Sequence, residues 1–264
     1  MKALKRVVKE SEKVFNNVIE GYSKLKGSEM KLDYHDIVIL GLLENLINQS
    51  KSMILLLENN QHSSLDTILR VIFENYVYIK FILEKDTPLR AKSYTYSTKI
   101  KEIELLNYLT EDSLDGYKLR NFLDLKKDEV KKVLTADKMD DKYQKSIRDG
   151  YLSEIGMKRT EQKWYNLDGK TKNFKALCLK IDLFVEYNLI YSILSIETHG
   201  KDALRNFRIE EDRIDLINMV KSKELYLSMS EMCLMESVKL IYENYGLKGP
   251  LKSFNTLVAI NYNK

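Results

Sequence analysis

Two pairs of polar residues, each four positions apart, interrupt apolar stretches of this sequence. Arg70 and Glu74 form the first pair, and Ser195 and His199 form the second within "YSILSIETHG". Residues four apart lie on one face of a helix. An imidazole or a carboxylate can transfer protons, a hydroxyl can donate a hydrogen bond, and a guanidinium can neutralise a phosphate oxyanion. Together they could do acid–base chemistry on a phosphate ester without a metal ion.

The stretch 182–199 predicts a helix buried in the middle of a bundle. Its apolar residues surround nearly the whole circumference of a helical wheel. Most of its polar residues share one narrow sector of the wheel: Asn188, Ser192, Ser195 and His199, with Tyr191 beside them. The pattern therefore predicts a single polar line on a buried helix.

A second expected helix, 34–58, carries a further polar line made of Asn45, Asn48 and Ser52. A charged pair such as Arg70 and Glu74, embedded in an apolar helix, would lose solvation unless it met polar partners. Three helices, each with one polar line, would best satisfy these polar groups if the lines faced one shared polar pocket. The structural alternative is that the Arg–Glu pair only fixes helix register and that His199 is a cap or a satisfied core residue.

The elements that would position these residues are helices. Only ten Gly and two Pro occur among 264 residues, which disfavours a sheet protein with many turns. Apolar spacing predicts helices over these ranges: 3–25, 34–58, 65–84, 88–109, 172–181, 182–199 and 223–245. We therefore expect an all-α protein, an up-and-down helical bundle that forms a single domain over residues 1–264.

Two parts of the chain are expected to lie outside this bundle. Residues 112–160 include the most charged stretch and predict a charged helical insertion. Its thin apolar face favours a solvated surface over an RNA-contacting arm, although a partner protein could bind there. Residues 248–264 are expected to form a C-terminal tail, which could dock on its own bundle or on a neighbouring subunit.

Three segments of the sequence resemble a group of uncharacterised bacterial helical proteins. These proteins carry R-x-x-x-E in one helix and Y-x-x-x-S-x-x-x-H in another, and the matching segments here are "RVIFENYVYIKFIL", "KWYN" and "YNLIYSILSIETHG". The positions that match are the following: Arg70, Glu74, Trp164, Tyr191, Ser195 and His199. The group is in turn similar in layout to the HEPN helical bundles. Many of those are metal-independent ribonucleases of toxin–antitoxin and anti-phage systems.

The resemblance implies roles for these residues in RNA cleavage. His199 would serve as acid or base, Glu74 as its orienter or as a base, and Arg70 would hold the phosphate. Ser195 and Tyr191 would hydrogen-bond the phosphate or ribose. The remaining residues expected to bind near the site are Asn48, Trp164 and Ser192. The HEPN signature places an Arg a few residues before a His on one helix, whereas His199 precedes Arg205 here, so the sequence departs from that pattern.

The same resemblance implies RNA as the partner, a homodimer, and no cofactor or metal ion. The alternative function is a non-catalytic bundle that binds a ligand, senses it, or interacts with another protein. Lys plus Arg exceed Asp plus Glu by only 43 to 39, which is compatible with RNA contact but is no footprint of a dedicated nucleic-acid binder. The sequence lacks a phosphate-binding glycine loop and the strand–turn–helix elbow of a serine hydrolase.

The compartment follows from apolar patterning and cysteine use. Charged residues interrupt every apolar stretch before the ~20 residues that a bilayer needs, and the N-terminus lacks the apolar core of a secretory signal. Cys178 and Cys233 lie within apolar helical patterns, with no metal-ligand spacing. We expect a cytoplasmic protein with two buried thiols and no membrane contact.

Overall fold

The computed structural model describes residues 1–26, 32–62, 64–136, 139–192, 207–210, 213–216 and 222–262. Most of these residues are helical, which confirms the all-α class. They form two compact units. The first comprises Met1–Thr87 and Cys178–Lys264, and the second comprises Pro88–Leu177, which includes the expected 112–160 insertion. The expectation of a single domain over 1–264 stays a prediction.

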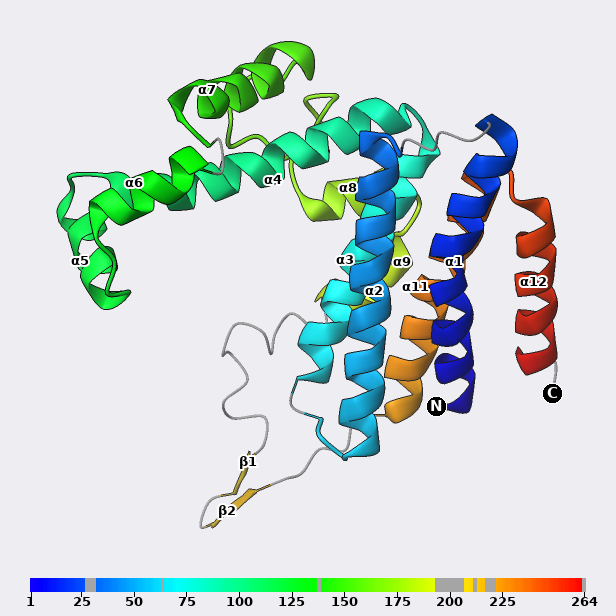
Figure 1. The fold of residues 1–264 in the computed structure, drawn as a ribbon. Coiled ribbons are helices and arrows are strands. Elements are labelled where there is room, and N and C mark those ends of the chain that lie inside the picture. Colours follow the sequence, from blue (N-terminus) through cyan, green and yellow to red (C-terminus); the bar gives the residue numbers. More distant parts are fainter. Residues whose placement is uncertain are drawn as a thin grey trace. The chain divides into compact units, whose positions relative to one another are not determined.

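The first unit is a helical bundle of four long helices (Figure 1). They are α1 (Lys2–Lys26), α2 (Tyr34–Glu58), α3 (Leu65–Glu84) and α11 (Lys223–Asn244). Helix α2 packs on α3, α3 on α11, and α1 on both α2 and α11. The bounds of α2, α3 and α11 lie within one residue of those predicted, because their apolar residues recur at the spacing of a helix face that packs in a core.

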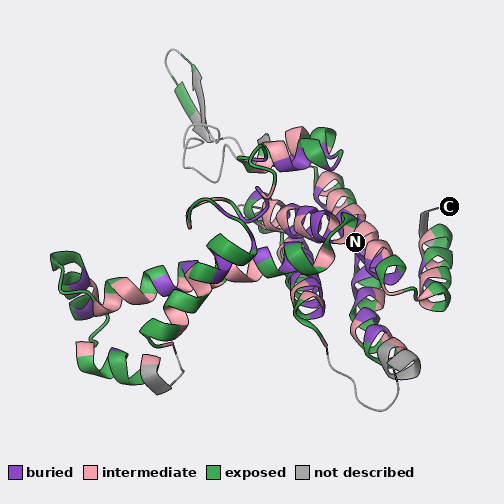
Figure 2. Cartoon of the chain, turned by 90° about the horizontal axis from the view of Figure 1, so that it is seen from above, coloured by how far each residue is buried: buried purple, intermediate pink, exposed green. Residues whose placement is uncertain are grey.

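Several fully buried apolar side chains show where the core of this bundle lies. They include Leu4, Val7, Ile39, Leu43, Leu46, Leu69, Ile72, Phe73, Leu234 and Val238. In Figure 2 the buried residues concentrate on the facing sides of these helices. Each fully buried side chain of this size contributes roughly 1.5–3 kcal/mol to stability, so the apolar spacing is the main reason why these helices assemble.

Helices α2 and α11 end in a left-handed residue that reverses the chain. At the end of α2, Asn60 has a φ of 54°, and the Gln61 N–H donates to the Leu56 carbonyl at 2.8 Å. At the end of α11, Gly246 has a φ of 65°, and the Leu247 N–H donates to the Tyr242 carbonyl at 2.9 Å. These bonds satisfy carbonyl groups that would otherwise lack a partner at the helix end.

The predicted helix 182–199 differs from the structure. A turn at Asp182, with a φ of 58°, separates α8 (Phe174–Lys180) from α9 (Phe184–Glu186). The chain then continues as a π-helix, η2 (Tyr187–Ser192). Phe184 and Val185 are exposed, so the prediction of an apolar surface buried all round is wrong for the described part of this stretch. Residues 193–199 lie outside the described residues.

Two further elements of the first unit were not expected. The C-terminal tail is the helix α12 (Lys248–Tyr262), and its Phe254 ring packs on Tyr242 at a centroid distance of 6.3 Å. The strands β1 (Phe207–Glu210) and β2 (Arg213–Leu216) form an antiparallel hairpin in which Phe207 pairs with Leu216. The expected C-terminal tail is thus helical over most of its length.

The second unit is also helical and contains α4 to α7. These elements are α4 (Thr87–Thr110), α5 (Leu114–Phe122), α6 (Lys127–Ala136), α7 (Asp141–Asp149) and the π-helix η1 (Gly150–Glu154). Helix α4 agrees closely with the predicted 88–109, and the charged segment is helical as expected. Few residues of α5, α6 and α7 are buried (Figure 2), which agrees with their charged sequences.

None of the described helices combines the length and the apolar composition that are needed to cross a bilayer.

Candidate functional site

Arg70 and Glu74 form an ion pair on one face of α3. The Arg70 Nε donates to the Glu74 Oε1 at 3.1 Å, as expected for residues one helical turn apart. Exposed i,i+4 pairs of this kind stabilise a helix by only about 0.3–0.5 kcal/mol. The arginine precedes the glutamate, which is the less favourable order with respect to the helix dipole. Helix stability alone therefore gives little reason for this pair.

The Arg70–Glu74 ion pair is partly buried. The Arg70 side chain is 22% exposed and the Glu74 side chain is 28% exposed. Among their neighbours on α3, Leu69 and Phe73 are fully buried. The two charged side chains are therefore partly exposed, and the convergence of this pair on a shared polar pocket stays a prediction.

A second carboxylate, Glu186 of α9, approaches the same region. Burial, with a smaller effect from the negative charges of Glu186 and Glu74, raises the pKa of the Cys178 thiol to about 12. Glu186 also raises the pKa of Cys233 and of Tyr76, for which burial is the larger cause. Both carboxylates are thus within electrostatic reach of one buried thiol, Cys178 of α8.

Sequence reasoning missed Glu186. It lies outside the polar sector that contains Asn188 and Ser192 on an α-helical wheel. Its place beside α3 depends on the turn at Asp182 and on the π-helix that follows, neither of which has a signal in the apolar spacing. The only available signal was its charge within an apolar stretch.

The π-helix η2 contacts α3, the helix that carries the ion pair. Tyr191 and Ser192 belong to η2, although their side chains lie outside the described residues. Ser195 and His199 follow directly in the sequence, and they too lie outside the described residues. A π-helical turn brings together residues five apart, whereas an α-helical turn brings together residues four apart. The polar line drawn on an α-helical wheel therefore does not apply to residues 187–192.

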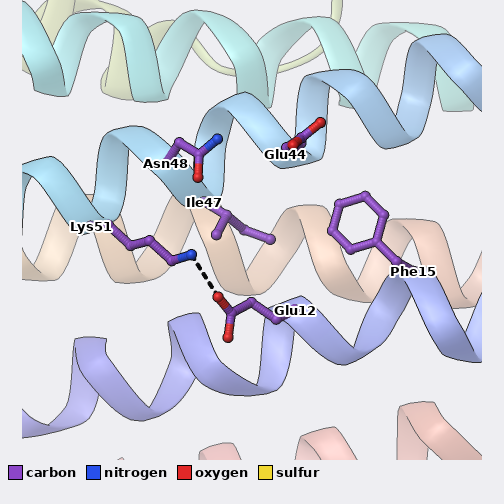
Figure 3. Close-up of a pocket in the computed structure, with 6 residues that line it drawn as sticks. All are labelled: Glu12, Phe15, Glu44, Ile47, Asn48 and Lys51. Carbon is purple, nitrogen blue, oxygen red and sulfur yellow. Dashed lines mark ion pairs between the residues drawn. The ribbon is translucent and has the colours of Figure 1, made fainter.

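Asn48 lies in a groove between α1 and α2 (Figure 3). The groove has a volume of about 300 Å³, and an ion pair between Lys51 and Glu12, with an Nζ–Oε1 distance of 2.6 Å, crosses it. Its other lining residues are Phe15, Glu44 and Ile47. Asn45 and Ser52 are exposed as well, so the expectation that this polar line faces an interior pocket is wrong. A binding role for Asn48 stays a prediction.

Trp164 belongs to the core of the second unit. Its ring is buried and packs edge-on against Tyr94 at 5.1 Å and against Tyr165 at 5.6 Å. Its carbonyl oxygen accepts a hydrogen bond from the Ser93 hydroxyl at 2.7 Å. These contacts account for the "KWYN" segment as packing within the unit, and the predicted binding role of Trp164 stays untested.

A group of potential metal ligands lies at the start of α2. Within the described residues, Asp33, His35 and Asp36 place one ligand atom each within 4.8 Å of one another. The Asp36 Oδ2 already accepts a hydrogen bond from the Asp33 N–H at 2.8 Å, and its Oδ1 accepts one from the Tyr245 hydroxyl at 2.7 Å. Capping of α2 and packing of α11 thus explain the buried carboxylate, and no metal is needed to account for it.

Comparison with known proteins places these residues in a family. The model of a family of unknown function, DUF5677, matches residues 36–215. Searches among curated proteins and among solved structures found no match to the chain. The matched range begins in α2, ends in β2, and includes every residue from Asn48 to His199 that the sequence nominated for the site. Because the match covers well over half of its length, the chain belongs to the DUF5677 family of unknown function.

Proposed function

We propose that this protein is a metal-independent ribonuclease with a HEPN-like site, of the kind that acts in bacterial stress or anti-phage defence. Its site is built around Arg70 and Glu74 of α3 and around Ser195 and His199, which follow η2 in the sequence. The observation that carries the proposal is the contact of η2 with α3, the helix that holds the partly exposed Arg70–Glu74 pair. Tyr191 and Ser192 of η2 complete the candidate set.

These side chains can supply the base, the acid and the cation that cleavage of an RNA phosphodiester requires. The ribose 2′-hydroxyl attacks the phosphorus, and its proton passes to His199 or Glu74 as the base. The bond from phosphorus to the 5′-oxygen breaks, and the leaving oxygen takes a proton from the acid of the pair. Arg70 stabilises the charge that develops on the phosphorane oxygens. The products are a 2′,3′-cyclic phosphate end and a 5′-hydroxyl end.

Two features of the structure support the proposal. The Arg70 Nε donates to Glu74, which orients a planar guanidinium of the kind that binds phosphates. The π-helix η2, which contacts α3, is a second feature, because π-helical turns are rare and occur frequently at functional sites.

Incubation of the purified full-length protein with RNA in the presence of a chelator tests the proposal. The wild-type protein is expected to give cyclic-phosphate ends, and His199→Ala and Arg70→Ala are expected to abolish them. Lys51→Ala is the matched control, because Lys51 forms an ion pair with Glu12 in the α1–α2 groove. Cleavage that persists unchanged in His199→Ala removes the proposal, since it would then come from another group or from a contaminant.

A non-catalytic ligand-binding bundle is the second candidate. It is favoured by the two carboxylates, Glu74 and Glu186, that approach the same thiol, because paired negative charges weaken the attraction of a phosphate to Arg70. Under this alternative the wild-type protein leaves RNA intact and retains a small molecule through purification. Mass spectrometry of the denatured protein solution would identify such a ligand, and Arg70→Ala would lose it.

A further inference from the structure

A pocket lies where α12 packs on α1 and α11 of the first unit (Figure 1). Its volume is about 260 Å³, just below the roughly 300–1,000 Å³ of pockets that hold drug-sized ligands, so it suits a single small ring. We call this space the α12 pocket. Seven of the described residues line it: Glu10, Lys13 and Asn17 of α1, Tyr242 of α11, and Pro250, Ser253 and Phe254 of α12.

Tyr242 supplies a buried hydroxyl to the α12 pocket. The residue is only 2% exposed, and its ring packs edge-on against Phe254. The hydroxyl oxygen accepts a hydrogen bond from the Asn17 Nδ2 at 2.7 Å, and no acceptor for the hydroxyl hydrogen occurs among the described residues. Rotation of the Asn17 amide by half a turn reverses this bond and makes an amide N–H the unused donor. In both orientations the pair offers the pocket at least one donor and one acceptor.

The Tyr242 hydroxyl is a hydrogen-bond donor at neutral pH. Burial raises its pKa above the ordinary value of 10.0, against a smaller lowering by the bond from Asn17, and the negative charge of Glu10 also raises it. Glu10 lines the same pocket, so a phenol and a carboxylate border one space. A ligand group between them must accept a hydrogen bond from the phenol and donate one to the carboxylate. An alcohol hydroxyl does both.

The charges at the α12 pocket cancel. The Lys13 Nζ donates to both carboxylate oxygens of Glu10, at 2.8 Å and 2.7 Å, and the other five described residues that line the pocket are uncharged. A phosphate site needs an excess of positive charge, and a site for a metal ion needs an excess of carboxylates. The α12 pocket therefore favours a neutral ligand that is held by hydrogen bonds.

Ser253 and two apolar groups complete the α12 pocket. Ser253 is exposed, and its hydroxyl makes no hydrogen bond with the described part of the chain, so it can bind a second hydroxyl of a ligand. Pro250 and Phe254 add apolar surface to the wall. Apolar surface with a few polar groups at fixed places is the usual composition of small-molecule sites. A sugar ring matches it, because its carbon atoms are apolar and its edge carries hydroxyls.

We infer that the α12 pocket binds a free monosaccharide. One ring hydroxyl accepts a hydrogen bond from Tyr242 and donates one to Glu10, and a second hydroxyl contacts Ser253. The ring carbons pack on Pro250 and Phe254. The inference is independent of the proposed ribonuclease chemistry, because the pocket uses α1, α11 and α12 and the proposed cleavage site uses α3 and η2.

Saturation-transfer NMR on the purified full-length protein tests this inference. The probes are glucose, galactose, mannose and ribose at millimolar concentrations. The wild-type protein is expected to transfer magnetisation to the ring hydrogens of at least one of them. Tetrahydropyran is the matched control ligand, because it has the ring without hydroxyls and should receive none. Transfer to no sugar overturns the inference, and so does equal transfer to tetrahydropyran.

Two substitutions show where the sugar binds. Tyr242→Phe removes the buried hydroxyl and is expected to weaken binding roughly 5-fold, the loss typical of one hydrogen bond. Ser253→Ala should also weaken binding, and it changes an exposed residue, so the fold is kept. Tyr34→Phe is the matched control, since Tyr34 of α2 is 71% exposed and lies outside the pocket. Circular dichroism checks that all variants keep their helices.

The outcomes separate this inference from the proposed cleavage. Wild-type affinity in both Tyr242→Phe and Ser253→Ala overturns the inference, because the pocket then holds only water. Arg70→Ala should bind the sugar as the wild-type protein does, whatever its effect on RNA.

Discussion

The hydroxyl of Tyr245, at the carboxyl end of α11, donates a hydrogen bond to the carboxylate of Asp36 in the first turn of α2, with an Oη–Oδ1 distance of 2.7 Å. At the opposite end of α11, the Tyr226 hydroxyl donates to Asp66 in the first turn of α3. Both carboxylates are buried, and both lie where the helix dipole favours a negative charge. Two tyrosines of one helix therefore fix its position along α2 and α3.

Tyr245→Phe is expected to lower the free energy of unfolding by about 1–3 kcal/mol, because the buried Asp36 loses a donor that water cannot replace. Urea unfolding monitored by circular dichroism measures this change. Tyr34→Phe is the control on α2, the helix that carries Asp36. Tyr34 is 71% exposed, so its substitution should change stability by less than about 0.5 kcal/mol. Equal losses in the two variants would show that the Tyr245–Asp36 bond does not stabilise the bundle.

Gly116→Ala is expected to destabilise the corner between α4 and α5 by roughly 1–3 kcal/mol, because the added methyl group meets backbone oxygens that cannot move independently. Hydrogen exchange of the α5 amides should increase. Gly41→Ala is a contrasting variant, since a Cβ at this exposed position of α2 meets nothing within 4 Å. It should stabilise the protein by about 0.5–1 kcal/mol through helix propensity. Unchanged exchange in Gly116→Ala would contradict the close approach of the two helices.

Arg70→Lys is expected to lower RNA cleavage roughly 10²-fold, although the positive charge remains. Lysine lacks the planar guanidinium that can contact Glu74 and a phosphate at the same time. Initial rates measured on a short fluorescent RNA would test this expectation. If the lysine variant cleaves at the wild-type rate, Arg70 acts only as a point charge and its pairing with Glu74 has no catalytic use.

The buried thiols predict a dependence of stability on alkaline pH. Burial raises the pKa of Cys178 from its ordinary value of 9.0 to about 12. Below pH 9 the thiol is protonated in both the folded and the unfolded state, so its contribution to stability is constant. Above pH 9 the unfolded thiol ionises first, and the free energy of unfolding falls until the pH reaches the folded pKa. The wild-type protein should therefore lose more stability than Cys178→Ala between pH 8 and pH 10, in urea titrations at each pH.

A thiol-reactive disulfide reagent gives a second readout of the same burial. Cys178 and Cys233 should react at pH 8 roughly 10²-fold more slowly in the folded protein than in urea, because a protonated and buried sulfur is a poor nucleophile. Fast reaction of either thiol in the folded state would show that the packing around it opens.

The sequence by itself predicted most of the helices of the bundle. Helix α3 illustrates the reason, since its apolar residues recur at intervals of three and four over twenty positions and leave little room for another structure. The Arg70–Glu74 contact was predictable on the same ground. A residue and its neighbour one turn later meet wherever the helix forms, whatever else the chain does.

The accessibility of the site depended on which helices pack together. Asn48 shares an exposed face of α2 with Asn45 and Ser52, and it lines a groove beside α1. Arg70 and Glu74 are partly exposed, whereas Leu69 and Phe73 of the same helix are buried. Helical spacing shows which residues share a face, but the packing of the neighbouring helices decides whether that face is covered.

The region after α8 shows the same division between local and tertiary structure. A wheel with α-helical periodicity could not anticipate the turn at Asp182 or the π-helix that follows, because a π-turn has no distinct apolar spacing and is stable only where its surroundings support it. Glu186 and Glu74 therefore came within electrostatic reach of Cys178 only in the folded chain. Local spacing along the sequence determined the helices and the contacts within each of them. Only the tertiary structure decided which charges meet between helices, because that depends on how separate segments turn and pack.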